Sequence, residues 1–286
     1  MLEVNISMEA TCDLEKEFIE KYDLKVVNMN FEVDGEFFDT KEDDVVSSKL
    51  YEKMVQKKKT GTSQINEFTY EEFFTNLLKE GKPIVHLALS SGLSGTVDGA
   101  RAAAEKLNQK GNEKVYVIDS LCVCSGQGLL GMVLRNYAEN CKSVEELVAY
   151  AELMKHKIYH YFTVDSLTYL ANGGRLNSKA AFIGNLLNIK PVMEASREGK
   201  LEVMHKVISR KKSISSISNL ISKSYDEQFS YCFIAHANCI KDALLMKEKI
   251  EAETKLKPVI VNLGPVIGCH SGPGTLAVFF VGKENR

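Results

Sequence analysis

The chain has 286 residues, more than one hydrophobic core usually holds, so we expect two domains or one domain with a large insertion. Its 36 basic and 38 acidic side chains give a net charge of −2, and no basic face carries interleaved aromatic residues, which argues against a nucleic acid partner. The seven cysteines lie mostly in apolar runs, and no run is long enough to span a membrane, so we expect buried thiols and a reducing, cytoplasmic compartment.

The first half of the chain alternates strand-like and helix-like segments. Such alternation predicts an α/β domain with a doubly wound, mostly parallel sheet. In sheets of this kind a ligand binds beyond the carboxyl ends of the strands. The predicted strands are Leu2 to Ile6, Lys25 to Val33, 83–89 and 115–119, and the predicted helices are 13–22, 96–109 and 125–140.

The second half has fewer helices, spaced further apart, and predicts an α+β domain with a mixed or antiparallel sheet. We expect the first domain to comprise residues 1–157 together with 275–286, because the last strand can rejoin the first sheet. The second domain then covers 158–274. The predicted strands here are 158–164, 190–194, 201–209, 229–236 and 257–262, and the predicted helices are 143–157, 210–227 and 238–256.

Three loops carry hydroxyls and glycines at strand ends: 60–68, 90–96 and 264–274. The third holds four glycines, two prolines and His270 within eleven residues. Glycine permits turns that a Cβ would forbid and proline fixes φ, so this composition specifies one tight backbone path. Such a loop presents His270, backbone N–H groups or both. The alternative is an arch between two buried strands with His270 packed beneath it.

In the second loop, Ser94, Gly95 and Thr96 lie where a helix is predicted to begin. Free N–H groups and the positive end of the helix dipole converge there, which makes an anion site. Serine and threonine are also the commonest helix N-caps, whether or not a ligand binds.

A serine hydrolase is a second interpretation of the same residues. Gly92 to Thr96 does not match the G-x-S-x-G nucleophile motif, although Ser94 and His270 could still meet in space. Asp119 and Asp165 are the candidates for an acidic partner. The sequence has neither a phosphate-binding nor a dinucleotide-binding glycine motif, and its histidines show no metal-ligand grouping.

The pair Gly173 and Gly174 precedes Arg175 at a predicted helix end. Two glycines there are typical of an ordinary helix C-cap. Alternatively, they hold the guanidinium of Arg175 toward an anion or a protein partner.

Together these segments resemble the DegV family, bacterial fatty-acid-binding proteins that include the lipid-carrying subunit of fatty acid kinase. The matching segments follow the family's order and span nearly the whole chain. They are Thr62 to Gln64, Ser90 to Thr96, Val117 to Ser120, Leu170 to Pro191 and Gly264 to Gly274.

The resemblance implies a non-catalytic carrier without metal or cofactor, which holds a long-chain fatty acid in a tunnel and presents its carboxylate to a separate kinase that forms an acyl phosphate. It places Thr62 and Ser94 on the carboxylate and His270 near the same head group. It assigns Arg175 to the surface that faces the kinase catalytic subunit. Transient contact with a membrane for lipid exchange is compatible with this function, without an integral membrane segment.

The chain departs from the family pattern in two places. Met8 and Glu9 replace a small polar pair in the turn after the first strand, and Ile65 stands where proline is common. The rival functions are a serine hydrolase or acyltransferase that uses Ser94 and His270, and a lipid sensor. Four apolar residues are candidates for the tunnel wall or for plain core packing, namely Phe182, Ile183, Leu186 and Leu187.

Overall fold

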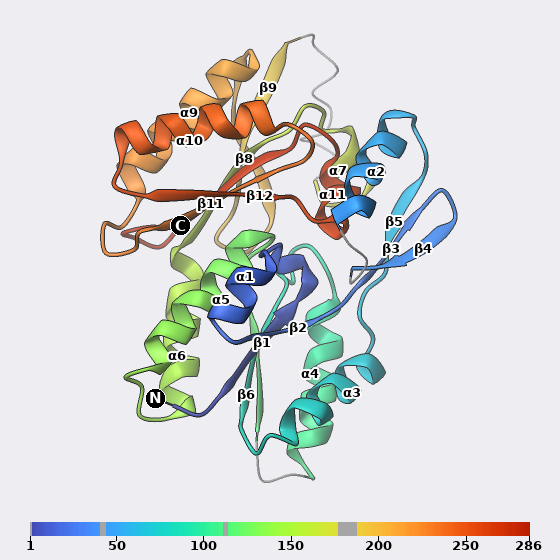
Figure 1. Ribbon diagram of the computed structural model, residues 1–286, viewed down its shortest axis with the longest axis vertical. Helices are drawn as coiled ribbons and strands as arrows, with labels where there is room; N and C mark the ends of the chain where they lie inside the picture. Colours follow the sequence, from blue (N-terminus) through green and yellow to red (C-terminus); the bar gives the residue numbers. More distant parts are fainter. Residues whose placement is uncertain (1, 41–43, 111–113, 177–187) are drawn as a thin grey trace.

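The computed structural model describes residues 2–40, 44–110, 114–176 and 188–286. Their strands form a four-stranded, a six-stranded and a three-stranded sheet. Figure 1 shows the four-stranded sheet in the lower half of the molecule, the six-stranded sheet in the upper half and the small sheet at the right. The carboxyl ends of the lower strands point toward the upper sheet.

The four-stranded sheet is parallel, in the order β2 (Leu24–Val27), β1 (Asn5–Glu9), β6 (Ile84–Ala88) and β7 (Val115–Asp119). The central strands β1 and β6 are buried at every residue, because helices cover both faces of the sheet. One face carries α3 (Glu67–Leu78) and α4 (Thr96–Asn108), and the other carries α5 (Ser125–Ala138) and α6 (Val144–Met154) (Figure 1). The predicted doubly wound sheet is confirmed.

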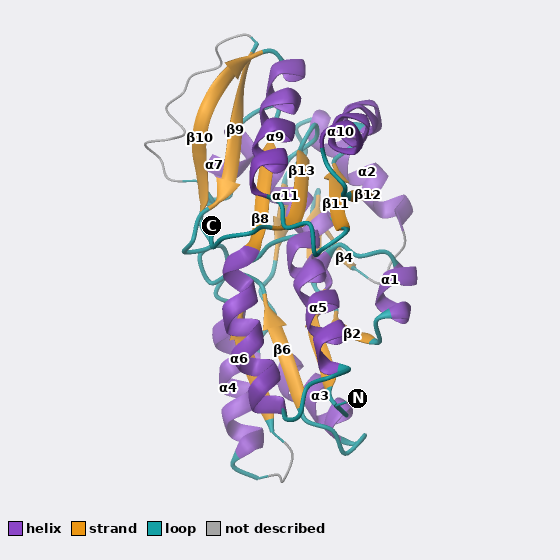
Figure 2. Ribbon diagram, turned by 90° about the vertical axis from the view of Figure 1, so that its left-hand side faces the viewer, coloured by secondary structure: helices purple, strands orange, loops and turns teal. Residues whose placement is uncertain are grey.

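The six-stranded sheet is mixed, in the order β10 (Leu201–Ile208), β9 (Ile189–Ala195), β8 (Ile158–Thr163), β13 (Leu276–Val281), β11 (Tyr231–His236) and β12 (Lys257–Asn262). The pair β11 and β12 is parallel and the others are antiparallel. One face packs on α9 (Arg210–Ser224) and α10 (Ile240–Glu253), which Figure 2 shows beside its strands. The other face packs on α5, so this helix is shared between both large sheets. The predicted mixed sheet of the second half is confirmed.

The last strand does not rejoin the first sheet, so the expected grouping of 275–286 with residues 1–157 is wrong for this strand. β13 lies between β8 and β11, antiparallel to both. All its residues are buried. Consecutive residues such as Phe279 and Phe280 point to opposite faces of the sheet and belong to different hydrophobic clusters. A strand buried on both faces needs a central position, whereas the edge strands β2 and β7 of the first sheet keep partly exposed residues.

The segment 25–33, predicted as one strand, forms parts of two sheets. β2 ends at Val27, and β3 (Asn30–Val33) starts the small sheet with β4 (Glu36–Asp39) and β5 (Thr60–Thr62). An Asp34-Gly35 turn with positive φ at both residues joins β3 to β4, as hairpins prefer. β5 pairs with β3 and thereby fixes Thr62 opposite Phe31.

The shorter elements connect these layers. The helix predicted at 13–22 begins later, because Asp13 adopts a left-handed conformation with φ 43°. The remaining elements are η1 (Ala10–Cys12), α1 (Lys16–Lys21), α2 (Asp44–Val55), η2 (Lys155–Lys157), α7 (Thr168–Asn172) and α11 (Pro265–Ser271).

The glycine- and proline-rich segment 264–274 folds mainly as the helix α11, not as a loop. Pro265 occupies its first turn, where a missing N–H costs nothing, and Gly272 ends it with φ 81°. A Cβ at Gly268 would collide with the hydroxyl of Tyr51, so this glycine lets α11 pack closely. The prolines and glycines thus mark the helix ends and place His270 in the last turn.

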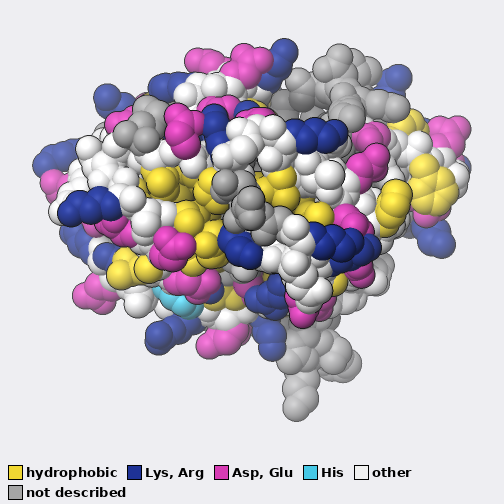
Figure 3. All heavy atoms as spheres, turned by 90° about the horizontal axis from the view of Figure 1, so that it is seen from below, with side chains coloured by type: hydrophobic (Ala, Val, Ile, Leu, Met, Phe, Trp, Pro, Cys, Tyr) yellow, Lys and Arg dark blue, Asp and Glu magenta, His cyan; other side chains and the backbone are white. Residues whose placement is uncertain are grey.

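Charged side chains of both signs are interspersed on the face seen in Figure 3, around a central group of apolar ones. Among the described residues, no helix combines the length and apolar character needed to cross a membrane. All seven cysteines have free thiols, and five of these cysteines are buried.

Candidate functional site

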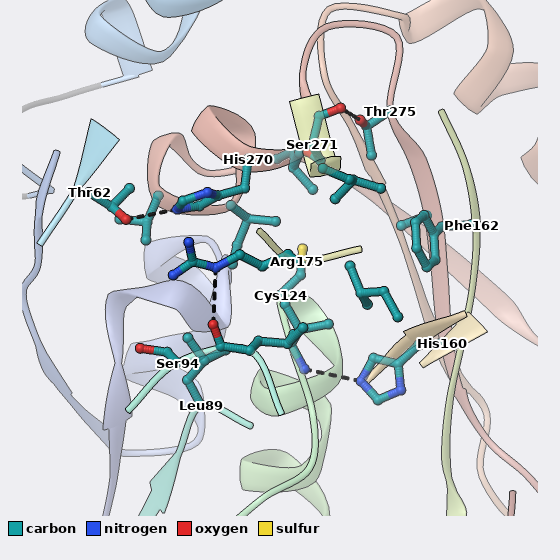
Figure 4. A pocket seen from close by; sticks show the side chains of 18 of the residues that line it. Thr62, Leu89, Ser94, Cys124, His160, Phe162, Arg175, His270, Ser271 and Thr275 are labelled. Atoms are coloured by element: carbon teal, nitrogen blue, oxygen red, sulfur yellow. Dashed lines mark hydrogen bonds between the residues drawn. The ribbon is translucent and has the colours of Figure 1, made fainter. Parts of the chain in front are cut away.

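A cavity lies between the two large sheets, beyond the carboxyl ends of the first. It has about 180 Å³ of room for the centres of water-sized atoms. One water molecule needs ~10–15 Å³ on this measure, so the cavity has room for a chain of many atoms. Its polar lining residues are Thr62, Ser63, Gln64, Ser94, His160, Arg175, His270, Ser271 and Thr275. Figure 4 shows Thr62, His270, Arg175 and Ser94 gathered on one side.

Thr62 and His270 form the first contact of this polar group. Thr62 Oγ1 lies 2.8 Å from His270 Nε2, which joins the end of β5 to the last turn of α11. Burial, together with the positive charge of Arg175, lowers the pKa of His270 to about 4. The imidazole is therefore neutral at neutral pH, with one donor and one acceptor nitrogen.

Ser94 lines the same cavity from the turn that precedes α4. Its Oγ accepts a hydrogen bond from the N–H of Thr96 at 3.3 Å. The N-cap position of α4 is Gly95, which offers no side-chain cap to the helix. The three residues that we predicted to bind a ligand thus line one cavity, although they come from three different segments.

Arg175 also lines the cavity. Its Nε donates to the carbonyl oxygen of Leu93 at 3.1 Å, and Nη1 donates to the carbonyl oxygen of Gly173. In Figure 4 the guanidinium lies between the His270 and Ser94 sides of the polar group. The resemblance assigned Arg175 to a surface that faces a kinase, and this role stays a prediction.

The C-cap interpretation of the Gly173-Gly174-Arg175 segment is confirmed, and the alternative, that the glycines hold Arg175 toward an anion or a protein partner, stays a prediction. The N–H groups of Gly174 and Arg175 bond to the carbonyls of Ala171 and Leu170, a Schellman motif that ends α7. Gly174 has φ 71°, as that motif requires. Gly173 leaves room for the imidazole of His270, because a Cβ at this position would lie 2.6 Å from His270 Nδ1.

The rest of the lining is mostly apolar. Figure 4 shows Phe162 and His160 on the side away from Thr62. His160 is buried, which lowers its pKa well below the usual value, and its Nε2 accepts the N–H of Val123 at 3.2 Å. The apolar residues of the wall include Leu89, Val123, Phe162, Leu201, Ala277 and Phe279. Phe182, Ile183, Leu186 and Leu187, our candidates for the tunnel wall, lie outside the described residues.

The residues proposed for a serine hydrolase do not form a triad. His270 Nε2 bonds to Thr62, and Ser94 Oγ to the backbone of its own turn. Asp119 Oδ1 accepts the N–H of Ser91 from the 90–96 loop and the N–H of Leu121 from its own loop, and Asp165 pairs with Lys190 at 2.7 Å. Both aspartates therefore act as loop residues.

Several polar lining residues escaped the sequence analysis. Ser63 and Gln64 follow Thr62 directly, and Ser271 and Thr275 flank the end of α11. Their proximity in sequence to Thr62 and His270 was the available signal. Within the described ranges, no three His, Cys, Asp or Glu side chains gather as metal ligands would.

Comparison with known proteins identifies the family. The DegV family model matches residues 3–283. A DegV domain-containing protein of Clostridium perfringens is 35% identical over 285 residues, 98% of each chain. The structure of DegV, a fatty acid binding protein from Bacillus subtilis, is 27% identical, covers 99% of this chain and 100% of that one, and has a TM-score of 0.84. That of a stearic acid-binding protein from Eubacterium ventriosum is 25% identical, covers 99% of both chains and has a TM-score of 0.86. The chain therefore belongs to the DegV family.

Proposed function

We propose that this protein binds a long-chain fatty acid in the cavity and presents its carboxylate to a separate kinase for conversion to an acyl phosphate. The observation that carries the proposal is the gathering of Thr62, Ser94, Arg175 and His270 on one side of a mostly apolar cavity. An amphiphile with one acidic end and one long apolar tail has this distribution of polarity. The relatives of known structure that bind fatty acids support the same ligand class.

The apolar wall supplies most of the affinity. A fatty acid that buries about fourteen methylenes gains roughly 11 kcal/mol of gross transfer free energy, at ~0.8 kcal/mol per methylene. Residues such as Phe162, Ala277 and Phe279 would contact this tail. Tail burial alone does not distinguish an acid from an alcohol or an ester.

The polar side chains discriminate a fatty acid from an alcohol or an ester with the same tail. A buried carboxylate needs hydrogen-bond donors, and the hydroxyls of Thr62 and Ser94 and the imidazole of His270 are available on this side of the cavity. Arg175 adds a positive charge beside them. Hydroxyls can also reorient around the larger and more negative head group of an acyl phosphate.

The kinase partner follows from the family resemblance, with Arg175 proposed to meet it. Within this chain, the bonds of His270 and Ser94 favour a carrier over a hydrolase. A cytoplasmic location is part of the proposal, because free thiols persist in reducing compartments.

Native mass spectrometry of the purified protein, followed by organic extraction, tests the ligand. We expect one fatty acid per chain, and its absence, together with no uptake of added palmitic acid by delipidated protein, would refute the carrier. Ala277→Phe should fill the tail region and abolish uptake. Ester hydrolysis that disappears in Ser94→Ala would instead establish the enzyme.

A second experiment tests the kinase. The loaded protein is incubated with ATP and a bacterial fatty acid kinase catalytic subunit, and acyl phosphate is trapped with hydroxylamine. Acyl hydroxamate that forms only with all three components supports presentation to a kinase. A bound fatty acid that yields none indicates a lipid sensor.

A further inference from the structure

Glu9, the last residue of β1, is a fully buried carboxylate. Tyr70 Oη donates to Glu9 Oε1 at 2.6 Å, and His86 Nε2 lies 3.3 Å from the same oxygen. The N–H of Leu89 donates to Oε2 at 2.9 Å, and Gln127 Nε2 donates to that oxygen as well. Burying a carboxylate is costly unless such donors surround it.

Burial by itself raises the pKa of Glu9, and the hydrogen bonds from His86, Tyr70 and Gln127 outweigh it, so the pKa of Glu9 lies below its usual value. Glu9 is therefore an anion inside the first domain. An apolar residue would fill this place at lower cost if packing were its whole purpose.

One donor lines the cavity, and the others lie in elements that adjoin cavity-lining segments along the chain. Leu89 follows β6 and lines the cavity itself. Gln127 lies in the first turn of α5, whose N-cap Cys124 lines the cavity. Its Nε2 also donates to the carbonyl oxygen of Leu87 at 2.7 Å. Tyr70 lies in α3, which follows the Thr62 segment.

Tyr70 extends the network to Ser94. Its hydroxyl oxygen lies 3.0 Å from Thr96 Oγ1, and the N–H of Thr96 bonds to Ser94 Oγ. A carboxylate only accepts hydrogen bonds, so Tyr70 must donate to Glu9 and accept from Thr96. The charge on Glu9 thus sets the direction of the Tyr70–Thr96 hydrogen bond, while the bond from the Thr96 N–H to Ser94 has a fixed direction.

We propose that Glu9 is a positioning residue for the head-group side of the cavity: it fixes the Ser94 turn relative to the Thr62 segment and thereby sets the preference for a carboxylate head group. This inference rests on the proposed function. It deepens that function by assigning carboxylate selectivity to a residue that does not touch the ligand.

The test compares a fatty acid with the alcohol of equal chain length, palmitic acid and 1-hexadecanol, on delipidated protein. Competition with a fluorescent fatty acid gives both dissociation constants and their ratio. A residue that only stabilises the fold affects both ligands alike, whereas a positioning residue changes the ratio. Glu9→Gln keeps the length of the side chain and removes its charge.

Tyr70→Phe keeps the ring and removes the link to Thr96. Ser218→Ala is the matched control, because Ser218 is equally buried and donates to Glu253 at 2.8 Å in the helix layer of α9 and α10. We expect the acid-to-alcohol preference to fall about tenfold in Glu9→Gln and in Tyr70→Phe, with alcohol binding changed less than about twofold. Ser218→Ala should keep the preference.

The double variant should lose no more preference than either single one, because both act through one path. The proposal is overturned if Glu9→Gln and Tyr70→Phe keep the wild-type preference, or lose affinity for both ligands equally. If Glu9→Gln does not fold, Tyr70→Phe decides by the same criterion. A wild-type protein that binds neither ligand overturns the proposed function as well, which separates the two failures.

Discussion

The hydroxyl of Thr62 lies 2.8 Å from Nε2 of His270, across 208 positions of sequence. The contact joins the small three-stranded sheet to α11 at the polar side of the cavity. Its energetic role can be measured, because threonine has a near-isosteric apolar counterpart.

Thr62→Val should weaken fatty acid binding about tenfold, because the variant removes one hydrogen-bond partner from a buried head group. Titration of delipidated protein with a fluorescent fatty acid measures the change. Thr60→Val is the matched control on the same strand, since Thr60 does not line the cavity. Equal losses in both variants would contradict a specific role for Thr62.

Acidification should destabilise the delipidated protein through His270. Its pKa is 6.5 ordinarily and about 4 in the folded chain, where burial and the charge of Arg175 lower it. Between these values the unfolded chain binds a proton that the folded chain lacks, so the free energy of unfolding falls as the pH falls. Urea unfolding at about pH 7 and about pH 5 should show the wild type losing ~1–2 kcal/mol more than His270→Gln.

Asp13 should lower the free energy of unfolding as the pH rises, which is opposite to the effect of His270. Burial raises its pKa from 3.8 to about 7, against the hydrogen bonds from Cys124 and Gly264. The folded chain holds a proton that the unfolded chain releases within this range, so the stability contribution falls as the pH rises. Asp13→Asn, which tolerates the left-handed backbone, should raise the free energy of unfolding at about pH 8 by up to ~4 kcal/mol and change it by less than ~1 kcal/mol at about pH 4. A variant less stable than wild type at the higher pH would contradict this.

The two glycines before Arg175 should respond differently to alanine. In Gly173→Ala the new Cβ would lie 2.6 Å from His270 Nδ1, so the imidazole must move and fatty acid affinity should fall. In Gly174→Ala the Cβ meets open space at φ 71°, so stability should fall by ~1 kcal/mol with affinity retained. Thermal unfolding and fatty acid titration of both variants separate the effects. The prediction fails if both variants show the same pattern.

The sequence pattern was sufficient for the parallel arrangement of the first sheet, whereas the convergence of Thr62, Ser94 and His270 was implied by the family resemblance. Apolar runs followed by helical patterns specify a parallel sheet, and the carboxyl ends of such strands meet at one edge. The helix α11 was missed, although Pro265 at its start and Gly272 at its end are the usual signals, because we took their density for a loop.

Other features depend on long-range packing that no local pattern encodes. The run 275–282 is equally apolar whichever sheet it joins, and only its position after α11 directs β13 between β8 and β11. The role of Glu9 could not be predicted, since its partners Tyr70, His86 and Gln127 lie far along the chain. A hydrogen-bond network between residues so far apart in sequence cannot be recognised from a local pattern.

The central place of β13 constrains the order in which the protein can be completed during synthesis. β8 and β11 have no common neighbour until this strand, the last one of the described chain, has been made. A nascent chain can fold its first sheet early, as N-terminal domains generally do. The cavity between the two large sheets therefore closes only after β13 has been made, and a protein truncated before β13 should expose the apolar faces of β8 and β11 and aggregate.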